Sequence, residues 1–189
     1  MLTFDDMDND SAVALLAKWR EMHNAWFPAQ FKVTFEGTRK WLRGGVIENP
    51  DRILFMLEGN DGSPLGHMGF YRFDFDSRTC EVDNVVRGEE TAPGIMTCAL
   101  AAMMVWGYAT LQVSRMLLST YSENEKAVSL YKRCGFEPLK KIPLVKKESP
   151  GRVEWVDAPE GSEPERYSLV MSHKMDFSLP WASKESERA

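Results

Sequence analysis

Cysteine is scarce in this chain, and the cysteines that occur do not suggest a metal site. Three are present among 189 residues, Cys80, Cys98 and Cys134. An odd, widely spaced set argues against a disulfide framework, and none of the three has the close Cys or His partner of a zinc site. We therefore expect buried thiols in a reducing cytoplasm, and no metal.

Basic residues are in the minority, and long apolar runs are missing. The 28 acidic and 23 basic residues give a formal net charge of −5, which argues against sequence-independent binding to nucleic acid phosphates. No apolar run reaches the length of a membrane span, and the acidic N-terminus is unlike a signal peptide. We expect neither a nucleic acid nor a membrane partner, and a cytoplasmic location.

The residues that are present have the composition of an ordinary globular domain. With 43% hydrophobic and 27% charged residues, the chain fits one domain with a sizeable core. The first half favours two helices followed by three strands. The expected helices cover 11–23 and 34–43, the second ending at Gly44-Gly45, and the expected strands cover 52–58, 65–75 and 79–86. The aromatic stretch 23–31 contains a proline and favours a loop.

The second half alternates helix and strand. Helices are expected at 94–111 and 124–136, and strands at 115–120, 136–145 and 166–171. Pro138 and Pro143 confine their strand to an edge or a bulge. Residues 146–164 are rich in charge, glycine and proline around one apolar island at 153–156, and residues 176–189 are expected to form a flexible tail. Pattern alone predicts a mixed α/β fold.

The helix at 124–136 has the most informative sequence. Asn124 is a suitable N-cap, and Glu125 lies in the first turn, where a carboxylate suits the positive helix end. Gly135 occupies the position of a left-handed residue after the helix. Four residues at helical spacing share one apolar face: Ala127, Leu130, Tyr131 and Cys134.

Taken as a unit, Asn-x-x-Ala-x-x-Leu-Tyr-x-x-x-Gly-Phe resembles a motif of the GNAT superfamily, which transfers acetyl from acetyl-CoA to an amine. The element order resembles the same fold over residues 1–175. The resemblance implies a single α/β (α+β) domain with a central, mostly antiparallel mixed sheet and helices on both faces. It also implies acetyl-CoA as co-substrate.

In that family a turn before the long helix binds the pyrophosphate of the cofactor, with backbone N–H groups and a helix N-terminus behind them. The aligned residues here are Thr91, Ala92, Pro93, Gly94, Ile95 and Met96. Gly94 fits the pattern, whereas Thr91 replaces a basic or amide residue, Met96 replaces a small one, and Pro93 lacks an N–H. The resemblance further implies that Val85 and Val86 hold the pantetheine arm through their backbone and that Asn124 faces the cofactor.

Four residues are candidates for the chemistry. The resemblance implies that Tyr131 gives a proton to the departing thiolate; a merely packed tyrosine is the alternative. Glu81 and Asp83 alternate along one strand, so both carboxylates point to one face, and mutual repulsion would suit a base. A solvated strand face explains them equally well. His67 on the neighbouring strand titrates in the useful range, although a lone strand histidine is more often structural.

The acceptor is expected to lie against the N-terminal aromatics. His23, Trp26 and Phe27 are candidates for that wall, with a core role as the alternative, and Arg87 is a candidate anion ligand or a surface ion pair. A loose resemblance suggests a nucleotide-linked amino sugar as the amine, with a protein N-terminus or side-chain amine next.

These features together predict direct acetyl transfer to a small-molecule amine in a ternary complex, because no cysteine has a convincing nucleophile setting. Two alternatives stay open: a non-catalytic binding module, suggested by Pro93 and Met96, and a donor with a different acyl chain. A homodimer through the C-terminal strands is permitted but not required.

Overall fold

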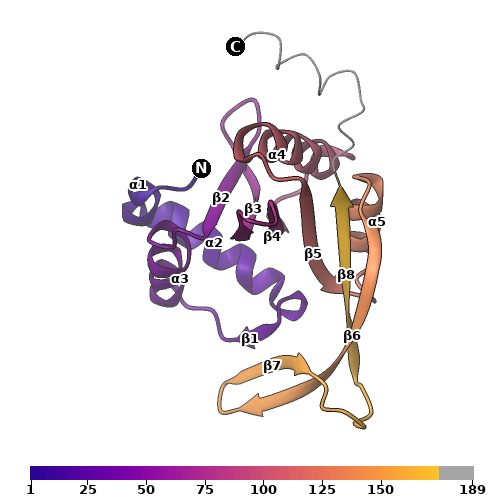
Figure 1. Cartoon of the computed structure of the whole chain (residues 1–189). Coiled ribbons are helices and arrows are strands. Elements are labelled where there is room, and N and C mark those ends of the chain that lie inside the picture. The colour runs from indigo at the N-terminus through magenta and orange to yellow at the C-terminus, as the bar shows by residue number, and fades with distance from the viewer. Residues whose placement is uncertain (175–189) are drawn as a thin grey trace, which may run out of the picture.

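The computed structural model describes residues 1–174, which are built around one mixed sheet (Figure 1). Eight strands in this region follow the order β1-β7-β6-β8-β5-β4-β3-β2, and every neighbouring pair is antiparallel except β4–β5. The strands are β1 (Ala29–Phe31), β2 (Arg52–Glu58), β3 (Pro64–Asp74), β4 (Thr79–Arg87), β5 (Arg115–Tyr121), β6 (Glu137–Ser149), β7 (Arg152–Asp157) and β8 (Arg166–Lys174).

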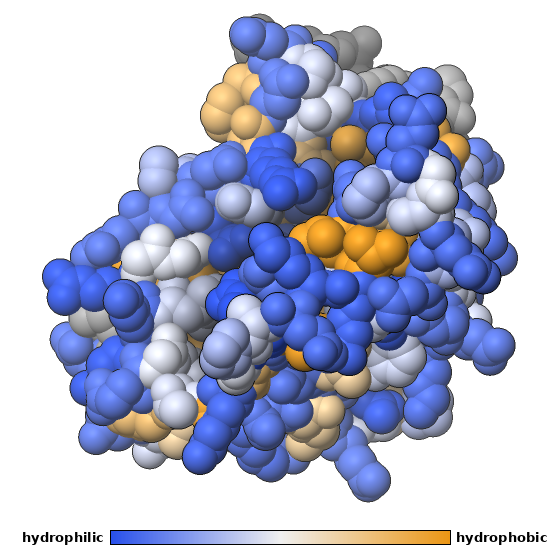
Figure 2. Space-filling model, turned by 90° about the horizontal axis from the view of Figure 1, so that it is seen from below, coloured by the Kyte–Doolittle hydropathy of each residue, from blue (hydrophilic) through white to orange (hydrophobic). Residues whose placement is uncertain are grey.

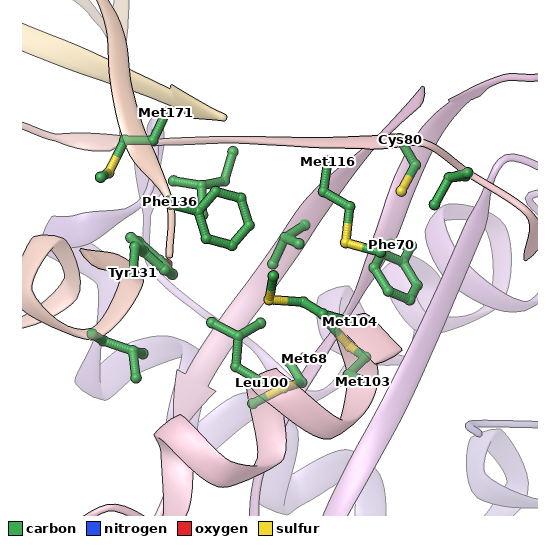
Figure 3. Packing of buried hydrophobic residues seen from close by; sticks show 14 of the residues in the cluster. Met68, Phe70, Cys80, Leu100, Met103, Met104, Met116, Tyr131, Phe136 and Met171 are labelled. Atoms are coloured by element: carbon green, nitrogen blue, oxygen red, sulfur yellow. The ribbon is translucent and has the colours of Figure 1, made fainter. Parts of the chain in front are cut away.

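Helices cover both faces of this sheet, as the sequence predicts. On one face lie α1 (Phe4–Asp8), α2 (Asp10–Met22), α3 (Phe35–Trp41) and the π-helix η2 (Leu42–Ile47); on the other lie α4 (Ile95–Leu111) and α5 (Glu125–Arg133). The core under α4 and α5 is rich in methionine. In Figure 3, Tyr131, Phe136 and Met171 lie on one side of it, and Phe70, Cys80 and Met116 on the other.

The helix start signals in the sequence are confirmed to within one or two residues. Asn9 caps α2 by accepting hydrogen bonds from the N–H groups of Ser11 and Ala12, and Thr34 caps α3 by accepting one from Gly37. Asn124 caps α5 in the same way, and Gly135 follows that helix with a φ of 84°. The short helix α1 was not predicted.

The predicted end of the second helix at Gly44-Gly45 is wrong. The backbone continues through both glycines as η2, because Leu42 and Val46 are buried in the core beneath α2 and hold the turn in place. A Cβ on Gly45 would lie 2.9 Å from the Trp41 ring, so this glycine lets the indole pack against the backbone. The pair therefore serves close packing and does not cap the helix.

The C-terminal strands are longer than the sequence pattern suggests. β6 runs on to Ser149, beyond the predicted end at residue 145, and pairs with β7, so the charged stretch that follows is partly strand. The loop predicted at 23–31 likewise holds a 3₁₀ turn, η1 (Asn24–Trp26), and β1. Pro138 and Pro143 lie in the half of β6 that pairs only with β8, and a bulge follows Pro138, as expected for strand prolines. The predicted tail at 176–189 lies outside the described residues.

Candidate active site

The site begins where β4 and β5 part. These parallel strands pair only from Thr79 with Arg115 to Glu81 with Leu117, although β4 continues to Arg87 and β5 to Tyr121. Beyond that point β4 pairs with β3 alone. The edge of β4 around Val85 and Val86 therefore presents backbone groups without a β5 partner, and such groups need a ligand or water.

A bulge at Asn84 re-aims the end of β4. Asn84 has a φ of 51°, in the left-handed region that asparagine tolerates better than most residues. Before it, Cys80 and Val82 face the core under α4 and α5; after it, Val86 faces the core under α2. The side-chain alternation is thus interrupted where the strands separate, and Val85 packs toward α4 and α5.

The turn into α4 has the geometry of an anion site. Gly94 has a φ of 89° and open space around it, and the N–H groups of Met96 and Thr97 have no backbone acceptor within the part of the chain that the structure describes. Free N–H groups at a helix N-terminus suit a phosphate. The Met96 side chain is partly buried and packs against the core under α4 and α5. Thr91 and Ala92 precede the helix in irregular backbone.

Tyr131 reaches the same region from α5. Its side chain is buried beside Phe136, with ring centroids 6.1 Å apart, and its hydroxyl has no hydrogen-bond partner among the described residues. Burial, and then the Asp83 charge on β4, raise the pKa of this phenol well above its usual value. The hydroxyl is therefore a proton donor at neutral pH.

The two carboxylates on β4 lie on one face, opposite Cys80 and Val82, but each has its own arginine. The Asp83 carboxylate is 3.1 Å from Nε of Arg52, an ion pair without hydrogen-bond alignment, and accepts a hydrogen bond from the Asn84 side chain. The Glu81 carboxylate lies 3.2 Å from Arg72. Each carboxylate is therefore balanced by an arginine of its own, and the predicted repulsion between the two does not dominate.

His67 on β3 pairs with Val86, but its side chain lies on the face of the sheet that α2 covers. It is 3% exposed, beneath the Trp19 ring at 6.0 Å between centroids, and its Nδ1 has no hydrogen-bond partner within residues 1–174. Burial lowers the pKa of His67 to about 4, so the imidazole is neutral at pH 7. This placement matches the structural role that the sequence left open.

The His67 environment predicts a pH-dependent stability. Because the folded pKa is depressed, the unfolded chain binds more protons, and the stabilisation present above pH 6.5 is lost as the pH falls toward 4. We expect His67 to account for a loss of about 2 kcal/mol in unfolding free energy between pH 8 and pH 5. Urea denaturation of the wild type and His67→Gln at both pH values measures it. An equal pH dependence in the two proteins would contradict this assignment.

The residues of the predicted acceptor wall lie in different environments in the structure. His23 ends α2, and its Nε2 lies 2.8 Å from the Arg87 carbonyl oxygen, which joins these two residues at the end of β4. Phe27 packs under the Arg20 guanidinium, 3.7 Å from Cζ to the ring centroid. Trp26 is exposed and lines a pocket of about 290 Å³ together with Glu123, Asn124, Glu125 and Lys126.

Sequence analysis did not bring Trp26 together with the charged residues around Asn124, which are Glu123, Glu125 and Lys126. Glu123 and Glu125 flank the α5 cap, and Glu123 pairs with Arg166 from β8. The Arg166 guanidinium also lies 3.3 Å from the Tyr121 ring centroid and 5.0 Å from that of Trp155. The signal in the sequence was the two glutamates around Asn124.

Figure 2 views the molecule from the side of β1 and β7, where hydrophobic residues form a recessed strip between hydrophilic ones.

Metal-ligand clusters and membrane-spanning helices are absent from residues 1–174. No group of three or more His, Cys, Asp or Glu side chains is placed there to hold a metal ion. None of the helices in the same range is long and apolar enough to cross a membrane.

Comparisons with known proteins identify the family. A model described as the acetyltransferase (GNAT) domain matches residues 2–137. Spermidine N(1)-acetyltransferase from Vibrio cholerae is 21% identical over 117 residues, which span 62% of this chain and 66% of that relative, just under two thirds of its length.

Solved structures share the fold. A variant of spermidine N-acetyltransferase from Vibrio cholerae has a TM-score of 0.68 at 15% identity, covering 92% of this chain and 96% of that one. A dodecameric spermidine N-acetyltransferase from the same organism has a TM-score of 0.64 at 15% identity, covering 92% and 94%. Since the family model matches well over half of the chain, the chain belongs to the GNAT acetyltransferase family, as the helix at 124–136 predicted.

Proposed function

We propose that the protein is an acetyl-CoA-dependent N-acetyltransferase that acetylates a primary amine of a small polyamine. The single observation that carries the enzymatic part is the convergence of three features at one place. These are the unpaired edge of β4, the free N–H groups at the start of α4, and the buried Tyr131 hydroxyl.

The proposed reaction uses these groups in order. The N–H groups of Met96 and Thr97 bind the pyrophosphate, and the backbone at Val85 and Val86 holds the pantetheine arm. The neutral amine attacks the thioester carbonyl, the C–S bond breaks, and Tyr131 gives its proton to the thiolate. We expect one of the β4 carboxylates, Glu81 or Asp83, to take the amine proton, because His67 is buried beneath Trp19.

The polyamine part rests on the relatives and on charge. The relatives reported above are spermidine acetyltransferases. The pocket beside Asn124 is lined by Trp26, Glu123, Glu125 and Lys126. Glu123 already pairs with Arg166, so we assign the contact with an ammonium group to Trp26 and Glu125. The nucleotide-linked amino sugar expected from the sequence has no counterpart among these relatives, so we place it second.

A panel of amines tests this proposal. Thiol release from acetyl-CoA is measured with spermidine, spermine, a nucleotide-linked amino sugar and a peptide with a free N-terminus. We expect polyamines to give a kcat/KM at least tenfold above the other amines, and Glu125→Gln to raise KM for spermidine severalfold. Glu160→Gln, an exposed glutamate outside the pocket, serves as the matched control. Preference for the amino sugar would replace the acceptor but keep the enzyme class.

Three further expectations remain predictions. One relative is dodecameric, so assembly of this chain into a homodimer or a larger oligomer is open to measurement by sedimentation. A cytoplasmic location and the absence of a bound metal also rest on the sequence argument.

A further inference from the structure

The first residue of β8, Arg166, lies inside a cage of aromatic rings. Its side chain is 13% exposed, and its guanidinium lies over rings from three different elements. The distances from Cζ to the ring centroids are 3.3 Å for Tyr121 of β5, 5.0 Å for Trp155 of β7 and 5.7 Å for Trp26 of η1. Aromatic faces attract a cation more strongly when it is removed from water. This guanidinium is therefore a fixed point between three strands and the turn η1.

Arg166 contacts both walls of the pocket beside Asn124. One wall is the indole of Trp26, and the other is the segment 123–126 at the start of α5. Arg166 lies over the indole and pairs with Glu123 of the second wall, although it does not itself line the pocket. Its contacts therefore join the two walls and set where they lie relative to each other.

The cage also holds the backbone on both sides of Trp26. Nη1 of Arg166 donates a hydrogen bond to the carbonyl oxygen of Ala25, 3.4 Å away. The two carbonyl oxygens that follow Trp26 accept hydrogen bonds from the other cage residues: Phe27 from the Tyr121 hydroxyl at 3.2 Å, and Pro28 from the Trp155 N–H at 2.9 Å. None of the three residues of η1 is buried, so contacts of this kind, and not core packing, fix its place.

We propose that Arg166 is a positioning residue for the acceptor amine, which it orients through Trp26 and Glu123 without touching it. The inference rests on the proposed function in one respect, namely that the amine binds in this pocket. Walls that are already fixed lose little freedom when the amine binds, so the amine binds more tightly.

Charge balance is the alternative role for this arginine, and it predicts the opposite result. If Arg166 only neutralised Glu123, its removal would leave a free carboxylate beside the pocket and would lower KM for a cationic amine. If Arg166 positions the walls, its removal raises KM in spite of that carboxylate. The sign of the change in KM therefore separates the two roles.

Steady-state kinetics of Arg166→Ala with spermidine measure that sign. We expect KM to rise about tenfold, with kcat within about threefold of the wild type and an unchanged calorimetric Kd for acetyl-CoA. Guanidinium chloride at tens of millimolar should lower KM of the variant again, because the free ion fits the emptied cage, whereas equimolar sodium chloride should not. Arg166→Lys, which keeps the charge but not the planar fork, should give an intermediate KM and serves if Arg166→Ala does not fold.

Arg152→Ala is the matched control. Arg152 also pairs with a glutamate, Glu154 at 2.8 Å, and its Cζ lies 5.4 Å from the centroid of the Phe31 ring. None of these three residues lines the pocket. This variant should keep KM for spermidine within about twofold of the wild type, as expected for an exposed ion pair.

Hydrogen exchange of residues 24–28, followed by mass spectrometry, tests the positioning role without any acceptor. The N–H groups of Trp26 and Phe27 donate to the carbonyl oxygens of His23 and Asn24. We expect Arg166→Ala to speed the exchange of this segment at least about fivefold, and Arg152→Ala to leave it unchanged. Thermal melting checks that each variant folds.

The outcomes are distinguishable. A fall in KM for spermidine would reduce Arg166 to a charge partner of Glu123, and faster exchange with an unchanged KM would make the cage a support of the fold alone; either result overturns the proposal. Unchanged KM and exchange in a folded Arg166→Ala protein would do the same. A wild type that acetylates no polyamine would instead refute the proposed acceptor. Exchange would then decide alone, because an unchanged rate removes the positioning role and a faster rate keeps it.

Discussion

We expect the Tyr131→Phe variant to turn over about 100-fold more slowly than the wild type, with little change in affinity for acetyl-CoA. The phenol is buried, its pKa is raised, and its hydroxyl has no hydrogen-bond partner among the described residues, so its loss removes a proton donor and little packing. General acid catalysis contributes about 10²–10⁴ in rate. Steady-state kcat and calorimetric Kd separate the two effects.

Tyr108→Phe is the matched control. Tyr108 is also buried with a raised pKa, but its hydroxyl lies 2.5 Å from Nδ1 of His173 on β8. Tyr108 has no part in the proposed proton transfer. This variant should keep kcat within about threefold of the wild type while losing about 1 kcal/mol of stability. If both variants turn over alike, Tyr131 is a packing residue and the proposed proton transfer is wrong.

A second large effect is expected from Gly69→Ala in the middle of β3. A Cβ at this position would lie 2.0 Å from the carbonyl oxygen of Ile53, a backbone atom of β2 that cannot move without breaking the strand pairing. Overpacking of this kind costs about 3 kcal/mol. In a domain of this size that lowers the melting temperature by about 10 °C, measurable by calorimetry.

Gly44→Ala supplies the comparison for that experiment. Gly44 is exposed in η2, has no heavy atom within 4 Å of an added Cβ, and does not have a positive φ. It should change the unfolding free energy by less than about 1 kcal/mol, in the stabilising direction. A Gly69→Ala protein as stable as the Gly44→Ala protein would mean that β2 and β3 are not packed as described.

Local patterns in the sequence were sufficient for much of the fold. The strand 52–58 matches β2 in both bounds, since an apolar run closed by a turn specifies such an element locally. The cap at Asn124, the buried face with Leu130 and Tyr131, and the left-handed Gly135 are also as predicted. The family followed from these residues because they form one motif at fixed spacing.

Features that depend on distant partners were not predictable in this way. The Gly44-Gly45 pair looks like a helix end, but burial of Val46 beneath α2 overrides the local signal. The sequence makes His67 a candidate base, but it does not show that Trp19 packs over the imidazole. It likewise does not show that Glu81 and Asp83 each pair with an arginine. The separation of β4 from β5 depends on pairing between segments more than thirty residues apart.

The candidate site was therefore only partly visible in the sequence. Gly94, Met96 and Asn124 lie at helix starts as expected, whereas the inward packing of Met96 could not be predicted from the turn alone because it requires the core of the whole domain. The Trp26 pocket joins residues almost a hundred positions apart, so the sequence places its two glutamates beside Asn124 but cannot place them beside the indole.

Acetyl-CoA binding to the purified full-length protein, measured by calorimetry, tests the central claim most directly. If the free N–H groups before α4 and the unpaired edge of β4 form the cofactor site, the dissociation constant is micromolar, about −8 kcal/mol in binding free energy. Gly94→Val, which forces a β-branched residue into a φ of 89°, weakens that binding at least tenfold. Absence of binding at millimolar acetyl-CoA would contradict the account and leave a GNAT fold that does not bind acetyl-CoA.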